Sequence, residues 1–230
     1  ALSAETAEGS LYETDMRLRP SGRAGPVATS LASFDRYQKE QAWTWEHMAL
    51  TRLRILTGDD ALGHAVERVA QAAINSDTSA TRTSDILDMR ARMMREKPAT
   101  GPWDLKLRRG GLVDIEFITQ HAILTAEADQ NLCPNLSAAQ KQLRDGGIWS
   151  ADDYETLTDA YAFLQALLQV QRMAHQGIAA EQDLSHALED RLCRAVGCEG
   201  FSTLLSRLEA TCARVTEKFA EKIGVLATET

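Results

Sequence analysis

The sequence predicts a mainly α protein, in which a helical bundle follows one short β-strand. Three observations favour this fold. Ala, Leu, Gln, Glu and Arg are frequent and runs of β-branched residues are few, which is typical of helices. Apolar residues recur three and four positions apart over long stretches, which is the spacing of one helix face. Gly, Pro and Ser residues stand between these stretches and indicate where helices begin and end.

The short strand is predicted at residues 11–20, after a small and polar stretch over 1–10 that we expect to be the frayed end of a helix. Its side chains alternate between a packed face and a charged face: Tyr12, Thr14, Met16 and Leu18 against Glu13, Asp15, Arg17 and Arg19. Pro20 ends the strand and Ser21-Gly22 turns the chain. The charged face is either the solvated side of an edge strand, or a site with a carboxylate beside a metal ion and guanidinium groups beside phosphates.

Helices are predicted over the rest of the chain. Capping residues or glycines bound them: 31–41, 42–56, 59–75, one capped by Ser84, one after Gly110-Gly111, 136–143, one capped by Ser150, 185–196 and one from about Phe201. Basic residues around the helix at Ser84 are assigned first to a solvated face, with a partner-binding or phosphate-facing role as the alternative: Arg82, Arg90, Arg92, Arg95 and Lys97.

The helix over 42–56 is crowded with aromatic and charged side chains. Two Trp, one Glu, one His and two Arg lie within residues 43–54. In a structural interpretation the aromatic rings are buried and Glu46 pairs with an arginine of its own helix. In a functional interpretation the same density marks a binding site.

A second cluster lies at 103–120. Charged and apolar residues alternate in its first part, which predicts an extended segment: Asp104, Lys106 and Arg108 with Leu105 and Leu107. Gly110-Gly111 permits a sharp turn into a helix that is apolar on nearly every side and therefore buried. Asp114 and Glu116 fall in its first turns, where a buried carboxylate needs a counter-charge. Candidates for that charge are Lys106, Arg108 and Arg109. The two acids either form a structural charge network or position a base toward a nucleotide.

The composition argues against several classes of function. The net charge of −8 disfavours non-specific nucleic-acid binding, which needs a basic surface. The longest apolar run, near 161–170, is too short to span a membrane, and we expect no signal peptide. None of the four cysteines forms a Cys-x-x-Cys pair, so we expect reduced, buried thiols in a cytoplasmic protein and no zinc site.

Three motifs resemble those of the glutamine synthetase adenylyltransferases, the two-headed enzymes of bacterial nitrogen control. The strand carries Tyr-x-x-Asp-x-Arg-Leu-Arg-Pro-Ser-Gly over 12–22. The next helix carries Trp-Glu-x-x-Ala-x-x-[Lys/Arg]-x-Arg over 45–54, with Leu53 at a position that is usually small. Residues 104–116 resemble Asp-x-Lys…Gly-Gly-[Leu/Ile]-x-Asp-Ile-Glu, a motif similar to one in the uridylyltransferases that modify the PII signal protein.

The resemblance implies two domains: the C-terminal end of a nucleotidyltransferase core at 1–58, closed by the strand remnant, and an all-helical appended domain at 59–230. It implies transfer of AMP from ATP to a tyrosine of glutamine synthetase, with Mg²⁺ held by three carboxylates. Asp15 is the expected catalytic and metal-binding carboxylate, and the other two, from a Gly-Ser…Asp-x-Asp motif upstream, are absent from this chain. The expected nucleotide-binding residues are Arg17, Arg19, Trp45, Glu46, Arg52, Arg54, Lys106, Asp114 and Glu116.

The resemblance also implies partners and leaves alternatives open. ATP, glutamine synthetase, the PII protein and glutamine as effector are the expected partners, with no nucleic acid and no membrane. Arg-Leu-Arg-Pro-Ser-Gly and Trp-Thr-Trp-Glu resemble the adenylylating, C-terminal half. We expect the chain alone to be inactive, because one carboxylate cannot hold two Mg²⁺ ions. The alternatives are a helical binding or regulatory module for glutamine synthetase, PII or glutamine, the deadenylylating half, and uridylylation of PII.

Overall fold

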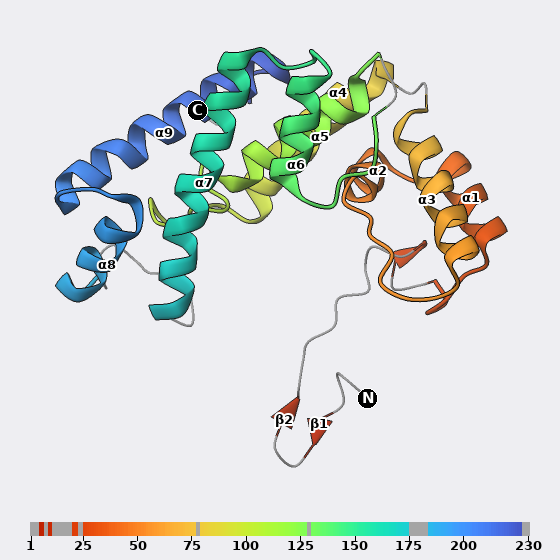
Figure 1. Cartoon of the computed structure of the whole chain (residues 1–230), viewed down its shortest axis with the longest axis horizontal. Coiled ribbons are helices and arrows are strands. Elements are labelled where there is room, and N and C mark those ends of the chain that lie inside the picture. Colours follow the sequence, from red (N-terminus) through yellow and green to blue (C-terminus); the bar gives the residue numbers. More distant parts are fainter. Residues whose placement is uncertain are drawn as a thin grey trace.

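The computed structural model describes residues 5–6, 9–10, 20–22, 25–76, 79–127, 130–174 and 184–226. Two short strands precede a series of helices: β1 (Glu5–Thr6), β2 (Gly9–Ser10), α1 (Leu31–Glu40), α2 (Thr44–Leu50), α3 (Asp60–Ile74), α4 (Ser79–Glu96), α5 (Leu112–Thr125), α6 (Leu136–Asp145), α7 (Ala151–Ala174), α8 (His186–Val196) and α9 (Phe201–Lys222). The mainly α fold predicted from the sequence is confirmed. Figure 1 shows α1, α2 and α3 at one end of the molecule and α8 at the other, with α5 between them.

The first ten residues depart from the prediction. β1 and β2 pair antiparallel, with Glu5 opposite Ser10 and Thr6 opposite Gly9. The helix end expected at 1–10 is therefore wrong for the residues that are described. Gly9 has a φ of +99°, which suits a tight turn and not a right-handed helix. The strand predicted at 11–20 lies outside the described residues, except for Pro20 in a turn.

Local capping sets the starts of α1 and α3 as the sequence indicates. The side chains of Ser30 and Asp59 accept hydrogen bonds from backbone N–H groups three residues on, at 3.2 Å and 3.0 Å. α2 is shorter than the predicted 42–56: it ends at Leu50, and the Thr51 hydroxyl that follows donates to the Met48 carbonyl at 2.7 Å. α1 and α2 both pack against α3.

The start of α4 differs from the prediction. The helix begins at Ser79, and Ser84 lies within it with its hydroxyl donating to the carbonyl three residues earlier. Arg82 lies in the core, 1% exposed, and not on the solvated face predicted for it. Its guanidinium donates to the carbonyls of Ile74 (2.9 Å) and Leu124. Arg82 thereby satisfies backbone acceptors at the C-terminal ends of α3 and α5, which explains why an arginine is buried there.

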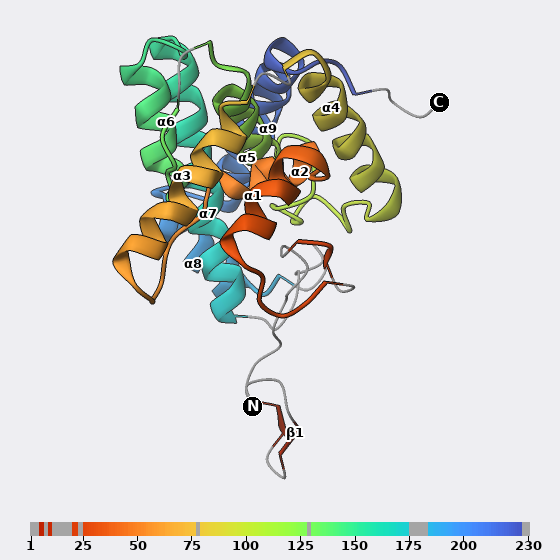
Figure 2. The same cartoon turned by 90° about the vertical axis from the view of Figure 1, so that its right-hand side faces the viewer.

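α5 forms the centre of the core. It contacts α2, α4, α6, α7 and α9, and the prediction of a helix buried on nearly every side is confirmed. Figure 2, viewed from the α1–α3 end, shows α4 and α6 on opposite sides of α5. None of the described helices is long and apolar enough to cross a membrane.

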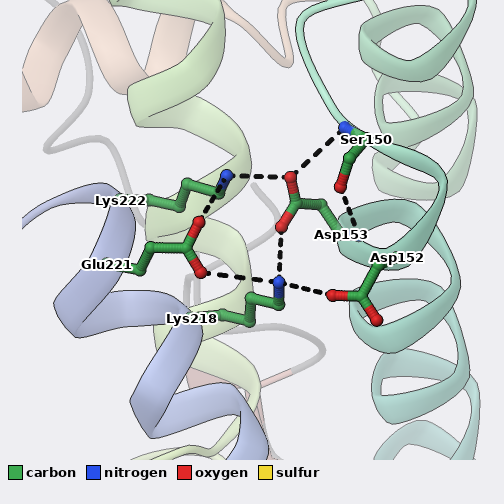
Figure 3. Close-up of polar contacts among 6 residues, drawn as sticks. All are labelled: Ser150, Asp152, Asp153, Lys218, Glu221 and Lys222. Atoms are coloured by element: carbon green, nitrogen blue, oxygen red, sulfur yellow. Dashed lines mark hydrogen bonds and ion pairs between the residues drawn. The ribbon is translucent and has the colours of Figure 1, made fainter.

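A charge cluster fastens α7 to α9 (Figure 3). Asp153, near the start of α7, accepts hydrogen bonds from Lys218 at 2.7 Å and Lys222 at 2.8 Å, both on α9. Its backbone N–H also donates to the Ser150 hydroxyl, which caps the helix. Burial alone would raise the pKa of Asp153, but these hydrogen bonds outweigh burial and hold the pKa well below its usual value.

Candidate functional site

Residues 101–111 form consecutive turns instead of the extended segment that alternation predicted. Asp104 causes the difference. Asp104 is 2% exposed, and its carboxylate accepts hydrogen bonds from the backbone N–H groups of Leu107 (3.0 Å) and Thr100 (3.4 Å). Such side-chain to backbone bonds favour turns over strands. Gln171 of α7 holds the same loop by donating to the Trp103 carbonyl at 3.2 Å. Asp104 therefore has a structural role in the site: it holds the loop in its turns.

The glycine pair shapes the junction between this loop and α5. Gly110 has a φ of +70° and lies against the backbone of α9 at Cys212. Gly111 is the N-cap of α5. The first N–H groups of the helix donate to loop carbonyls, Leu112 to Leu105 at 2.9 Å and Val113 to Lys106 at 3.1 Å. These contacts hold the loop across the start of α5.

Asp114 is buried and fully engaged. One carboxylate oxygen accepts from Arg90 Nε at 2.5 Å and the other from the Gly110 N–H at 2.6 Å. Arg90 also donates to the Leu107 carbonyl at 3.0 Å. Asp114 and Arg90 are each 1% exposed. The counter-charge thus comes from α4 and not from the nearby basic residues expected to supply it, and Arg90 is not on a solvated face.

Two charged residues of the same motif remain accessible. Lys106 is exposed on the loop, and Glu116 lies on α5 with its side chain 28% exposed. The Glu116 carboxylate is 3.6 Å from Arg52 Nη1, just beyond the end of α2. Arg54 follows two residues later and is exposed. Lys106, Glu116, Arg52 and Arg54 are the accessible charged residues of the two motifs, and we call them the charged strip.

Glu46 faces the interior of the α1–α2 corner. It is 7% exposed and accepts hydrogen bonds from the Tyr37 hydroxyl at 2.8 Å and from the Trp43 N–H at 2.9 Å. Burial and this hydrogen bond raise the pKa of Tyr37, so the phenol stays protonated and donates. Glu46 has no arginine partner from its own helix. Trp45, by contrast, is 38% exposed and lines a recess between α2 and α4.

Asp15, Arg17 and Arg19, the residues predicted on the strand, lie outside the described residues. In the part of the chain that is described, no group of three His, Cys, Asp or Glu side chains is placed to hold a metal ion. The four cysteines are free thiols; Cys193 and Cys212 are buried as expected, whereas Cys133 and Cys198 are half-buried. Burial raises the pKa of Cys212 to about 11, so this thiol is not a nucleophile at neutral pH.

The sequence prediction missed Arg90 and Tyr37, which hold Asp114 and Glu46. A signal for Arg90 was present, because Arg82, Ile86 and Arg90 recur every four residues on one face of α4. The buried Ile86 between them marks that face as the inner one.

Two family models match the chain. Residues 1–69 match the model described as glutamate-ammonia ligase adenylyltransferase, and residues 85–223 match that of the GlnD PII-uridylyltransferase. Both descriptions are of nucleotidyltransferases, and the second model covers the helices that surround the 104–116 motif.

Curated relatives make the assignment more specific. The chain is 39% identical over 95% of its length to a protein of Mesorhizobium japonicum, 41% over 94% to one of Rhizobium meliloti, and 40% over 100% to one of Xanthobacter autotrophicus. Each is named a bifunctional glutamine synthetase adenylyltransferase/adenylyl-removing enzyme. The chain belongs to the glutamine synthetase adenylyltransferase family, as its motifs indicated. It spans 22–23% of the length of these relatives.

Proposed function

We propose that this chain is part of an enzyme that transfers AMP from ATP to a tyrosine of glutamine synthetase. The observation that carries the proposal is that some residues of the 104–116 motif are buried and others are accessible, in a chain that belongs to this family. Asp104, Gly110 and Asp114 are buried and held by hydrogen bonds or close packing, whereas Lys106 and Glu116 are accessible. A frame of this kind fixes a few charged groups at a surface, which is what positioning a nucleotide requires.

The charged strip is the proposed phosphate-facing surface. Lys106, Arg52 and Arg54 would neutralise phosphate charge, and Glu116 would orient Arg52 through their contact at 3.6 Å. Glu46 and Asp114 are proposed to act by positioning α2 and α5, because neither is accessible to a nucleotide. Trp45 is left out of this phosphate-facing surface, because its recess between α2 and α4 also holds the carboxylates of Asp85 and Asp88, which would repel a nucleotide.

The assignments on the predicted strand rest on the resemblance. Asp15 is the proposed catalytic carboxylate and Mg²⁺ ligand, and Arg17 and Arg19 are proposed to face phosphates. When bound, Mg²⁺ neutralises charge on the triphosphate and on the leaving pyrophosphate. We assign no Mg²⁺ ligand to the described residues, because none of their acidic side chains form a suitable group.

Further parts of the proposal concern the whole enzyme. Glutamine synthetase and ATP are the proposed substrates, and PII and glutamine are proposed regulators in the cytoplasm. The chain is proposed to come from the adenylylating half and to be inactive alone. We propose the domain boundary after residue 58, as the resemblance implies.

A longer polypeptide that restores the upstream carboxylates would test the proposal by AMP incorporation into glutamine synthetase. Asp15→Asn should abolish transfer. Lys106→Ala should lower it about tenfold or more, the effect of losing one charge-assisted contact of about 1.5–3 kcal/mol, with Tm unchanged. Lys97→Ala, on an exposed lysine at the end of α4, is the matched control and should transfer AMP normally. An Asp15→Asn variant that still transfers AMP would show that the strand has only a structural role. If Lys106→Ala lowers Tm together with activity, the lysine has a structural role.

A second candidate function is a regulatory module without chemistry of its own. The match of residues 85–223 to a PII-uridylyltransferase model favours it for the helical domain. It predicts that substitutions on the exposed faces of α7 and α9 change the response to PII or glutamine while basal AMP transfer is unaffected. Loss of basal transfer in such variants would count against this module.

A further inference from the structure

Two of the four tryptophans are exposed, and both lie at the start of α2. Trp43 is 70% exposed and Trp45 is 38% exposed, whereas Trp103 and Trp149 are 1% and 4% exposed. Tryptophan has a large apolar surface to bury and is enriched near the centres of protein interfaces. An adjacent exposed pair therefore marks a candidate interaction surface.

The two rings line a recess between α2 and α4 with a volume of about 320 Å³. Its other walls include Met48, Asp85, Asp88 and Arg92, and we call it the tryptophan recess. Met48 is 3% exposed and provides an apolar floor. The Thr44 hydroxyl donates to the Asp85 carboxylate, which fixes this acid against α2. Asp88 is exposed one turn further along α4.

The lining selects for positive charge. It holds two carboxylates, Asp85 and Asp88, against the single guanidinium of Arg92. The faces of tryptophan rings attract cations and are the strongest aromatic partners for them. A nucleotide carries several negative charges and would be repelled by these acids. The volume also lies at the lower end of the range for small-molecule sites, about 300–1,000 Å³. A single cationic side chain fits both the negative charge of the lining and the small volume of the recess.

We propose that the tryptophan recess binds an arginine side chain presented by a partner protein. The guanidinium stacks on the indole of Trp43 or Trp45 and donates two parallel N–H groups to Asp88 or Asp85. Arginine fits better than lysine, because a compact ammonium group neither stacks nor donates in a fork. This inference does not depend on the proposed AMP transfer, since neither acid is assigned to it.

The tryptophans themselves supply the readout. The chain, labelled with ¹⁵N at its indole nitrogens, is titrated with acetyl-Gly-Arg-Gly-amide at up to millimolar concentration. We expect saturable shifts of the Trp43 and Trp45 indole signals and none of Trp103 and Trp149, which are buried elsewhere. Acetyl-Gly-citrulline-Gly-amide, which has the same shape without the charge, should leave all four signals in place, and so should AMP.

Substitutions then locate the site. Asp88→Asn should weaken binding of the arginine peptide about fivefold through loss of one exposed ion pair. Trp43→Ala should weaken binding of the same peptide about three- to fivefold through loss of the ring face. Both side chains are exposed, so the fold should survive. Asp159→Asn, on an exposed aspartate of α7, is the matched control and should bind as the unmodified chain does.

Several outcomes would overturn the proposal. Equal shifts with the citrulline peptide would show that charge is not recognised, and tighter binding of AMP would make the recess a nucleotide site. Absence of any shift with the arginine peptide would show that the recess is not a binding site for this group. In a longer polypeptide that restores the upstream region, Trp43 and Trp45 signals that no longer respond would show that the same chain covers the recess.

Discussion

Gly110 lies against Cys212 so closely that a Cβ built on the glycine would be 1.9 Å from the Cys212 carbonyl oxygen. The contact joins the loop before α5 to the backbone of α9, residues about a hundred positions apart in the sequence. Backbone cannot move aside as a flexible side chain can. The first glycine of the Gly-Gly motif is therefore required by close packing as well as by its φ of +70°.

Gly110→Ala should be strongly destabilising. A left-handed φ costs alanine about 1–2 kcal/mol, and displacing α9 adds to that, so we expect a loss of at least about 3 kcal/mol. Gly147→Ala is the matched control, because Gly147 has a φ of +72° and no atom within 4 Å of the added Cβ. Gly147→Ala should lose only the stability that a left-handed φ costs alanine, about 1–2 kcal/mol. Urea unfolding of both variants measures the difference, and equal losses would show that the approach to Cys212 is unimportant.

The Arg90–Asp114 pair should behave as a buried ion pair. Arg90→Met or Asp114→Asn leaves the partner buried and uncompensated, which should cost about 3–5 kcal/mol. The double variant should lose less than the sum of the two single losses, because no unpaired charge remains. Chemical denaturation of the four proteins completes the cycle. Additive losses would mean that the two side chains do not interact in solution.

Much of the fold follows from local signals in the sequence. α5 is apolar on nearly every side and was correctly predicted to be buried, and Ser30 caps α1 where expected. The helix predicted over 59–75 is present as α3, with Asp59 as its cap. The start of α4 was misplaced, because Ser84 offers a good local cap while the tertiary contacts of Arg82 favour an earlier start. A rule that places arginine on the surface fails where its guanidinium satisfies buried carbonyls.

The sequence predicted which residues belong to the candidate site, but not which of them are buried. Asp114 and Glu116 are two positions apart on a helix, so they point in different directions and cannot share one environment. One had to face inward, and the structure shows that it is Asp114. The partner of Asp114 could not be inferred from its neighbours in the chain, because Arg90 lies on another helix and approaches only through tertiary packing.

His121 should make the protein less stable in mild acid. Burial lowers its pKa to about 4, below the value of about 6.5 expected in the unfolded chain. As the pH falls from about 6.5 to about 4, the unfolded chain binds a proton that the folded chain does not, so the free energy of unfolding decreases.

His121→Gln should reduce that pH dependence, which unfolding curves at about pH 7.5 and about pH 5 would measure. His47, whose pKa burial also lowers, should supply a remaining part of the slope. An unchanged slope in His121→Gln would contradict the assignment.

Asp153 should contribute stability at neutral pH that is lost only in strong acid. Burial opposes its charge, but hydrogen bonds from Lys218 and Lys222 outweigh burial and keep its folded pKa below the unfolded value. The contribution is therefore complete above about pH 4 and decreases as the pH falls further.

Asp153→Asn should cost roughly 1–3 kcal/mol at neutral pH, because two lysines of α9 lose their charged partner. Its difference from the unmodified protein should narrow below about pH 4, where the aspartate of the unfolded chain becomes protonated while that of the folded protein is still charged. Asp159→Asn, on an exposed aspartate of the same helix, should cost little stability at neutral pH. A cost for Asp153→Asn that stays constant into acid would mean that the shape of the carboxyl group, and not its charge, fastens α7 to α9.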